Sequence, residues 1–372
     1  MTQFASDHAH RVVGLYGDPT VSWSILLEAD LFSAPEPEKL RARLAAALPQ
    51  YPHLGPAPSV EQATAAGFPE VRARFAAEPY ERGAPLVRVA VRTGEPALLV
   101  AAHHGALDGL GLLALLGFLL DVPVSSAARG IGERTGGGKP FLVSAVQRLA
   151  EALFAPPGRI EPDRDAERAG DVFEARCMPR LGLSAAGFVA AATHATGRWN
   201  RAHGARTARV VAALGASWRS GAAPEPVHDS AFFRLRLPSD PDSAGVADVL
   251  RAQPPEPDFP ARSSRIARLG TRLLASRLGS TFLVSNLGVV STGDTVRSIA
   301  FYPAASGRSG VAFGAATTGD TTTVTVRARR KDFGAAAAGR LAEQFRDAVR
   351  DQAGPAQDAG SRRRDAGDVP DQ

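Results

Sequence analysis

Residues 98–120 read LLVAAHHGALDGLGLLALLGFLL, and this stretch decides how the chain folds. The apolar run Ala97–Ala102, which leads into two histidines, is typical of a strand buried on both faces. A turn of small residues, an Asp-Gly pair and a leucine-rich helical segment follow. A histidine that leaves a core strand into a turn can have one ring nitrogen held while the other faces a cavity. The stretch therefore predicts a general base at the end of a buried strand.

The two histidines also have a purely structural interpretation, and the spacing of the polar residues in this stretch bears on the choice between the two. Two histidines at a strand end can equally be structural side chains with satisfied hydrogen bonds. Here His103, His104, Asp108 and Gly109 form the pattern HHxxxDG. This pattern resembles the signature of the chloramphenicol-acetyltransferase-like superfamily. That superfamily includes nonribosomal-peptide condensation domains, polyketide-associated acyltransferases, plant-type alcohol acyltransferases and bacterial wax-ester synthases.

Four further segments extend the resemblance over most of the chain. Residues 285–288 read SNLG, which is similar to a segment in the second lobe of several superfamily members, and residues 213–219 read ALGASWR, a strand closing on an arginine. The segments PHL at 52–54 and AEPYERGAPLVRVAV at 77–91 resemble the flanks of condensation domains. The resemblance implies an α/β (α+β) fold of two lobes, each a mixed β-sheet flanked by helices, with the active-site channel between them.

The lobes are expected at 1–165, which carries HHxxxDG, and at 166–352, which carries SNLG. A length of 372 residues suits two such lobes. The residues 353–372 are rich in Gly, Asp, Arg, Ala and Pro, and we expect them to be disordered. An amphipathic helix over 141–154 is predicted within the connection between the lobes. The chain is shorter than a typical condensation domain, and part of the shortening is expected between Leu54 and Pro85.

The resemblance implies a catalytic role for the histidine turn. His104 is the position at which the family has its general base, and His103 is interpreted as mainly structural. Gly109 is expected to leave space where the acceptor channel passes, so that a larger residue there would obstruct access. The implied reaction is acyl transfer from a thioester to an amine or hydroxyl, which needs a base beside the nucleophile and donors for the oxyanion.

Five other residues receive supporting roles from the same resemblance. Asp108 is expected to form an ion pair that holds the loop, with Arg219 as the candidate partner. Ser285, Asn286 and Gly288 are expected to line the opposite wall and to supply oxyanion donors. An Asn-Leu-Gly sequence is equally well explained as a tight bend, so a structural role for this segment stays open.

Substrates and partners follow from the reaction class. We expect no tightly bound cofactor and no metal. The acyl donor would be acyl-CoA or a phosphopantetheinyl carrier protein acting in trans, and the acceptor a small molecule, in specialised-metabolite biosynthesis. The alternative is a non-catalytic or repurposed condensation-like protein that binds a carrier-tethered intermediate or catalyses a cyclisation. The flanks favour a monomer.

Composition and charge exclude several other classes of protein. Hydrophobic residues make up 44% and charged residues 22%, values typical of a soluble globular protein, and the single cysteine excludes an intrachain disulfide. No signal peptide and no membrane-spanning run is evident, so a cytoplasmic protein is expected. The net charge is +5, and basic clusters at 327–331 and 362–364 are interpreted as solvated surface without a role in nucleic-acid binding, because no aromatic residues interleave with them.

Three motifs typical of other protein classes are incomplete or absent in this sequence. Gly109, Gly111 and Ala114 satisfy a loose dinucleotide fingerprint, GxGxxA, but no acidic residue ends a following strand at the required distance. The triglycine before Lys139 is followed by proline and is not a phosphate-binding loop. No GxSxG elbow of an α/β-hydrolase is present.

Overall fold

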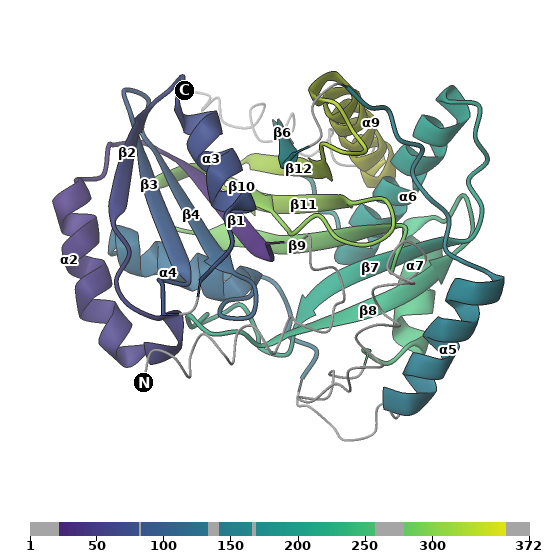
Figure 1. Ribbon diagram of the computed structural model, residues 1–372, viewed down its shortest axis with the longest axis horizontal. Coiled ribbons are helices and arrows are strands. Elements are labelled where there is room, and N and C mark those ends of the chain that lie inside the picture. Colours follow the sequence, from purple (N-terminus) through teal and green to yellow (C-terminus); the bar gives the residue numbers. More distant parts are fainter. Residues whose placement is uncertain (1–21, 82, 133–140, 166–168, 257–278, 355–372) are drawn as a thin grey trace, which may run out of the picture.

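The computed structural model describes residues 22–81, 83–132, 141–165, 169–256 and 279–354. Within these residues the chain forms two mixed β-sheets with helices packed on them, and the two sheets lie beside each other (Figure 1). The predicted two-lobed α/β architecture is confirmed. The predicted disordered tail and the basic cluster at 362–364 lie, from residue 355 on, outside the described residues.

The first sheet has the strand order β10-β1-β4-β3-β2. Its strands are β1 (Ser24–Leu31), β2 (Val60–Thr64), β3 (Val87–Thr93), β4 (Ala97–His103) and β10 (Val296–Tyr302). The helices of this half are α2 (Pro37–Ala47), α3 (Phe68–Ala77) and α4 (Gly109–Leu120), with the short 3-10 turns η1 (Leu48–Gln50) and η2 (Pro52–Leu54). The segment between Leu54 and Pro85 thus contains β2 and α3, which the sequence analysis did not anticipate.

Strand β4 is buried along its whole length, as its unbroken apolar run predicts. Leu98 and Val100 belong to the core on one face of the sheet, together with the leucines of α4. Leu99 and Ala101 belong to a separate core on the other face, which contains Phe68 of α3. Because both faces exclude water, side chains of both parities must be apolar. The histidine turn therefore starts from a rigid central strand.

The second sheet has the order β6-β12-β11-β9-β7-β8. Its strands are β6 (Asp171–Pro179), β7 (Val210–Ser217), β8 (Ser230–Leu237), β9 (Phe282–Ser291), β11 (Val311–Thr318) and β12 (Thr321–Arg329). The helices are α5 (Phe141–Phe154), with the bounds that the sequence predicted, α6 (Ala185–Ala202), α7 (Ser243–Ala252) and α9 (Ala335–Ala353).

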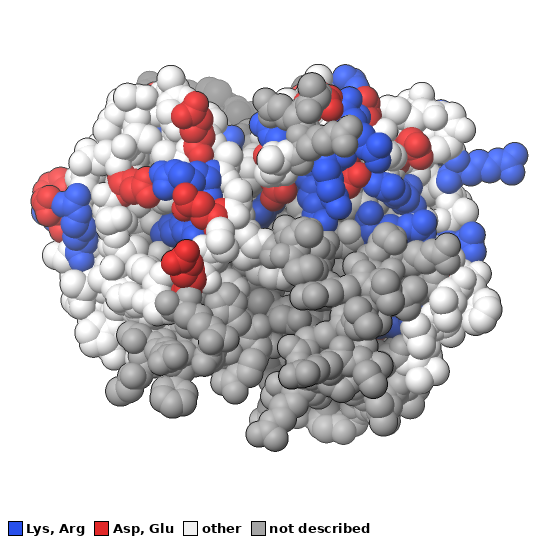
Figure 2. Space-filling view, viewed as in Figure 1, with Lys and Arg blue, Asp and Glu red and all other residues white. Residues whose placement is uncertain are grey.

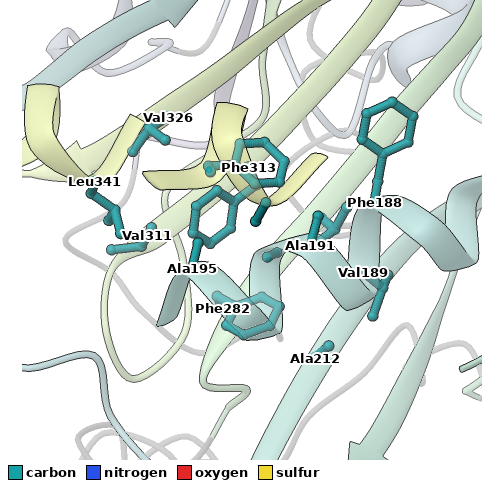
Figure 3. Packing of buried hydrophobic residues seen from close by; sticks show 14 of the residues in the cluster. Phe188, Val189, Ala191, Ala195, Ala212, Phe282, Val311, Phe313, Val326 and Leu341 are labelled. Carbon is teal, nitrogen blue, oxygen red and sulfur yellow. The ribbon is translucent and has the colours of Figure 1, made fainter. Parts of the chain in front are cut away.

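Aromatic and small side chains form the core between this sheet and its helices (Figure 3). Phe313 of β11 packs edge-on against Phe282 of β9, with 5.5 Å between ring centroids, and lies 4.6 Å from the ring of Phe345 on α9. Alanines of α6 such as Ala191 and Ala195 let the helix approach the sheet closely. This core holds β9 and β7, the two strands that approach the histidine turn.

The two halves exchange strands. Strand β10 comes late in the chain but pairs with β1, so that Leu26 lies opposite Tyr302 in the first sheet. The short strand β5 (Ser125–Ser126) pairs in return with β9 of the second sheet. A single division of the chain at residue 165 therefore does not describe sheet membership. The exchanged strands tie the two sheets together on either side of the histidine turn.

The expectation that the basic residues at 327–331 are solvated surface is wrong for Arg327. Its side chain is 1% exposed, with Nε donating to Asp171 Oδ2 at 2.7 Å and Nη1 donating to the carbonyl of Ser24 at 2.6 Å. Arg329 is buried as well. Arg327 joins the two halves, because its acceptors Asp171 and Ser24 belong to different sheets, and a buried guanidinium is tolerated only with such acceptors.

Two surface features complete the fold. On the face shown in Figure 2, basic side chains gather over the second half with acidic ones among them. Ion pairs in that half include Arg198–Asp351 and Arg176–Glu343, so part of the positive charge is neutralised locally. None of the helices within the described residues has the length and hydropathy needed to cross a bilayer.

Candidate active site

His104 lies in the turn between β4 and α4, half-buried, with its backbone N–H donating to the carbonyl of Trp23 at 2.7 Å. Its ring Nδ1 lies 3.2 Å from the carbonyl oxygen of Leu107. A carbonyl can only accept, so Nδ1 carries the hydrogen and, in the neutral ring, Nε2 carries the lone pair. Burial lowers the pKa of His104 below its ordinary value, against the opposing effects of Leu107 and Asp108. The geometry gives a neutral imidazole with a basic nitrogen at physiological pH.

His103 faces the core on the other side of β4. It is 2% exposed, and its Nδ1 accepts the backbone N–H of Gly105 at 3.2 Å. The ring of Tyr80 packs against it edge-on, with 5.3 Å between centroids. The contacts of His103 shape the turn, and its structural role stays a prediction.

Asp108 is 3% exposed and caps the N-terminus of α4. Its Oδ1 accepts the N–H of Gly111 at 2.7 Å, and its Oδ2 accepts the N–H of Asp229 at 2.9 Å. Arg219, the partner expected from the resemblance, lies with Nη2 3.6 Å from Oδ2. Burial raises the pKa of Asp108, while the two N–H donors and Arg219 act in the opposite direction. Both carboxylate oxygens of Asp108 therefore accept backbone N–H groups.

A loop of the second half, Glu225–Asp229, covers the histidine turn, and we name it the closing loop. Arg219 Nη1 and Nη2 donate to the carbonyls of Glu225 and Val227 at 3.3 and 3.2 Å. From the first half, His53 Nε2 lies 2.9 Å from the carbonyl of Pro226, to which it donates. Side chains from both halves thus hold this loop in one position.

His228 of the closing loop was not foreseen. Its ring lies 5.4 Å from the ring of His104, centroid to centroid, in an edge-on arrangement at 76°. No periodicity or motif surrounds His228 in the sequence, and the contact spans more than a hundred residues. Nothing in the local sequence therefore marks His228 as a neighbour of His104.

Two glycines of the motif have packing roles. A Cβ on Gly111 would collide with the carbonyl oxygen of Val227, so this position must be glycine for the closing loop to sit on α4. A Cβ on Gly109 would lie 2.9 Å from Leu287 and 3.2 Å from Phe301, both core side chains. The missing side chain of Gly109 thus leaves room for these apolar groups, and its expected place on the acceptor channel stays a prediction.

The SNLG segment lies on β9 against the start of α4. Asn286 Oδ1 accepts the N–H of Gly288 at 2.8 Å, and Gly288 has a φ of +75°. The register between β11 and β9 shifts here, so Leu287 and Gly288 oppose one residue of β11. This is a β-bulge, in which glycine readily adopts positive φ. Ser285 lies beside Gly215 of β7. Bulge formation accounts for Asn286 and Gly288 in structural terms.

Two cavities lie elsewhere in the described part of the chain. One cavity of about 590 Å³ is lined by Glu28, Arg92 and Arg297, and one of about 610 Å³ lies between α5 and strands β7 and β8. Neither includes His104 in its lining. Across the described ranges, no three His, Cys, Asp or Glu side chains converge as metal ligands would.

Comparison with known proteins gives a result at the level of structure. No protein-family model and no curated protein matches the sequence. The first condensation domain of the CDA synthetase superimposes with a TM-score of 0.62 at 14% identity, over 93% of this chain and 95% of that one. The starter condensation domain of rhizomide synthetase RzmA, in complex with C8-CoA and Leu-SNAC, gives 0.57 at 16% identity, over 95% and 93%.

A third solved structure with a similar fold is an epimerization domain. The epimerization domain from the third module of tyrocidine synthetase B gives a TM-score of 0.51 at 14% identity, over 89% of this chain and 90% of that one. The chain thus has the two-lobed condensation-domain fold. Condensation domains belong to the chloramphenicol-acetyltransferase-like superfamily, so the resemblance stated from HHxxxDG is confirmed at the level of fold.

Proposed function

We propose that this chain is an acyl-transferring enzyme of the condensation type, with His104 as its general base. The observation that carries the proposal is the contact between His104 Nδ1 and the Leu107 carbonyl, within an intact HHxxxDG turn. That contact leaves Nε2 as the basic atom, and burial keeps the ring neutral by lowering its pKa. The condensation-domain fold supports acyl transfer as the reaction class.

In the proposed reaction, Nε2 of His104 takes the proton of an acceptor amine or hydroxyl as the acceptor attacks the thioester carbonyl. A bond forms between the acceptor atom and the carbonyl carbon, and a tetrahedral oxyanion results. The carbon–sulfur bond then breaks, and the imidazolium returns its proton to the departing thiolate. No acyl-enzyme is needed. Asp108 takes no proton in this scheme, because its oxygens are occupied by Gly111, Asp229 and Arg219.

The acyl donor in this proposal is a thioester of phosphopantetheine, either acyl-CoA or a carrier protein that docks in trans. The RzmA domain, which holds C8-CoA, supports a thioester donor of this kind. The acceptor is a small molecule. Ser285, Asn286 and Gly288 remain our candidates for the wall that faces the oxyanion, on the strength of the SNLG resemblance. No tightly bound cofactor enters the scheme.

A second candidate function is favoured by the likeness to an epimerization domain. In that case the chain would act on one carrier-tethered intermediate, or cyclise it, without a second substrate. The two functions differ in their need for an acceptor. A product that forms from the thioester alone would favour the second candidate, whereas acceptor-dependent release of thiol would favour condensation.

The test is a thiol-release assay on the purified chain with octanoyl-CoA and a panel of other acyl-CoAs, each with amine and alcohol acceptors, and with products identified by mass. We expect His104→Ala to lower the rate by about 10²–10⁴-fold. His203→Ala is the control, because His203 stacks on Trp199 in the second half, away from the turn. Unchanged turnover in a folded His104→Ala protein would rule out the base assignment.

A further inference from the structure

The ring of His228 forms an unusual contact with the proposed base. Its centroid is 5.4 Å from that of His104 with the rings at 76°, an edge-on geometry that aromatic pairs favour. His228 Nε2 lies 2.8 Å from the hydroxyl of Ser230, which fixes the rotation of the ring. Two imidazoles from opposite halves of the molecule therefore meet at the mouth of the histidine turn.

The backbone on both sides of His228 is held by one residue of the motif. Asp108 N–H faces the carbonyl of Val227 at 3.5 Å, and Asp108 Oδ2 accepts the N–H of Asp229 at 2.9 Å. Asp108 is four residues after His104. The carboxylate that caps α4 thus sets the distance between His104 and His228. A loop that served only as cover would not need both neighbours of one histidine to be held.

Two imidazoles in contact cannot gain protons independently. A positive charge on one ring disfavours a second positive charge on a ring in contact with it, and groups that interact strongly share their titration steps. Burial already disfavours charge on His104. The other titratable or charged side chains around the pair are His53, His103, Asp108, Arg219 and Asp229.

We infer that His228 is a positioning residue for His104, and that the two imidazoles titrate as one coupled pair. A neutral His228 ring holds the His104 ring in its orientation and leaves Nε2 to accept the proton of the acceptor. A protonated His228 opposes the positive charge that His104 acquires during that transfer. The catalytic part of this inference rests on the proposed function, whereas the coupling of the two rings does not.

The coupling is tested by nuclear magnetic resonance on the full chain with isotope-labelled histidine, titrated without substrate. In the wild type, the His104 ring signals should shift in two steps, one of which reports His228. His228→Phe keeps an aromatic ring but cannot be protonated, and should remove the step that His228 causes. His203→Phe, a ring substitution remote from the pair, should leave the His104 curve unchanged. If His228→Phe does not fold, His228→Asn serves the same purpose.

Identical His104 curves in the wild type and in His228→Phe would overturn the pairing. The positioning role has its own readout in the thiol-release assay. At alkaline pH His228→Phe should keep kcat within about threefold, whereas His228→Ala should lower kcat about 10-fold with KM unchanged, because a misplaced catalytic group costs up to ~10²-fold. Equal kcat in His228→Ala and the wild type would refute positioning. If the chain is inactive toward every thioester, the proposed function is refuted. The coupling of His104 and His228 is then tested by the titration alone.

Discussion

The carboxylate of Asp108 accepts the backbone N–H of Asp229 at 2.9 Å, so that a side chain of the first half holds a loop of the second half over His104. The same carboxylate caps α4 through Gly111 and lies 3.6 Å from Arg219. One buried group thus joins three elements. The contacts of Asp108 therefore indicate a structural role that does not require contact with a reacting atom.

Replacement of Asp108 should lower the stability of the fold, because this carboxylate joins three elements. Asp108→Ala removes a helix cap, leaves the N–H of Asp229 without its acceptor and takes the negative charge from beside Arg219, and should lower the free energy of unfolding by about 2–4 kcal/mol. Asp108→Asn keeps one acceptor oxygen and should cost less. Urea unfolding of both variants measures the difference. Equal losses would mean that the hydrogen bonds to Gly111 and Asp229 contribute nothing beyond the charge.

The lowered pKa of His104 predicts how activity depends on pH. Because the neutral ring is the base, the acidic limb of kcat/KM should be centred below the ordinary value of 6.5. The unfolded chain binds a proton at this histidine near pH 6.5 while the folded chain does not. The free energy of unfolding should therefore rise with pH from the lowered pKa up to about 6.5. His104→Gln should flatten that rise in denaturation curves, and an acidic limb above 6.5 would contradict the assignment.

Two helical glycines give a matched comparison. Gly111→Ala in α4 drives a methyl group against the Val227 carbonyl and should destabilise the fold by about 1–3 kcal/mol. Gly197→Ala in α6 meets the flexible end of Arg201 at 3.5 Å and the carbonyl of Ser239 at 3.9 Å, which are ordinary contacts, and should stabilise by about 0.5–1 kcal/mol through helix propensity. Thermal unfolding of the two variants measures opposite shifts. A neutral Gly111→Ala would show that the closing loop can move away freely.

The buried pair of Arg327 and Asp171 should be sensitive to loss of one partner. Arg327→Met leaves Asp171 beside the core without its guanidinium, and should cost about 3 kcal/mol. The double variant Arg327→Met/Asp171→Asn removes both charges and should recover part of that loss. Additive effects in the double-mutant cycle would mean that the two side chains do not interact energetically.

Local patterns predicted the centre of the molecule well. The apolar run before His103 predicted a strand buried on both faces, and the amphipathic pattern predicted α5 with its observed bounds. Both predictions depend on neighbours within a few residues, which a sequence displays directly. A local pattern can also mislead: Ser33 and Glu36 have the spacing of a capping box, but α2 begins at Pro37, with Glu36 as N-cap and no side-chain hydrogen bond at that cap.

Long-range relationships could not be predicted in this way. Asp108 and Asp229 are 121 residues apart, and Arg327 and Asp171 are 156 apart. Nothing in the composition around 327–331 distinguishes a buried arginine from a solvated one, since the acceptors that permit burial come from elsewhere in the chain. The place of His228 beside His104 is of the same kind.

The exchange of β10 has a consequence for how the chain comes to be folded during synthesis. Until Tyr302 has left the ribosome, β1 is the outer strand of its sheet, with a row of backbone groups that await a partner. A nascent first half therefore exposes unpaired backbone N–H and C=O groups along β1, and these groups can pair with a strand of another chain. A fragment cut at residue 165 should aggregate or borrow a strand from another copy, and adding the remainder as a separate polypeptide should suppress this by supplying the missing strand.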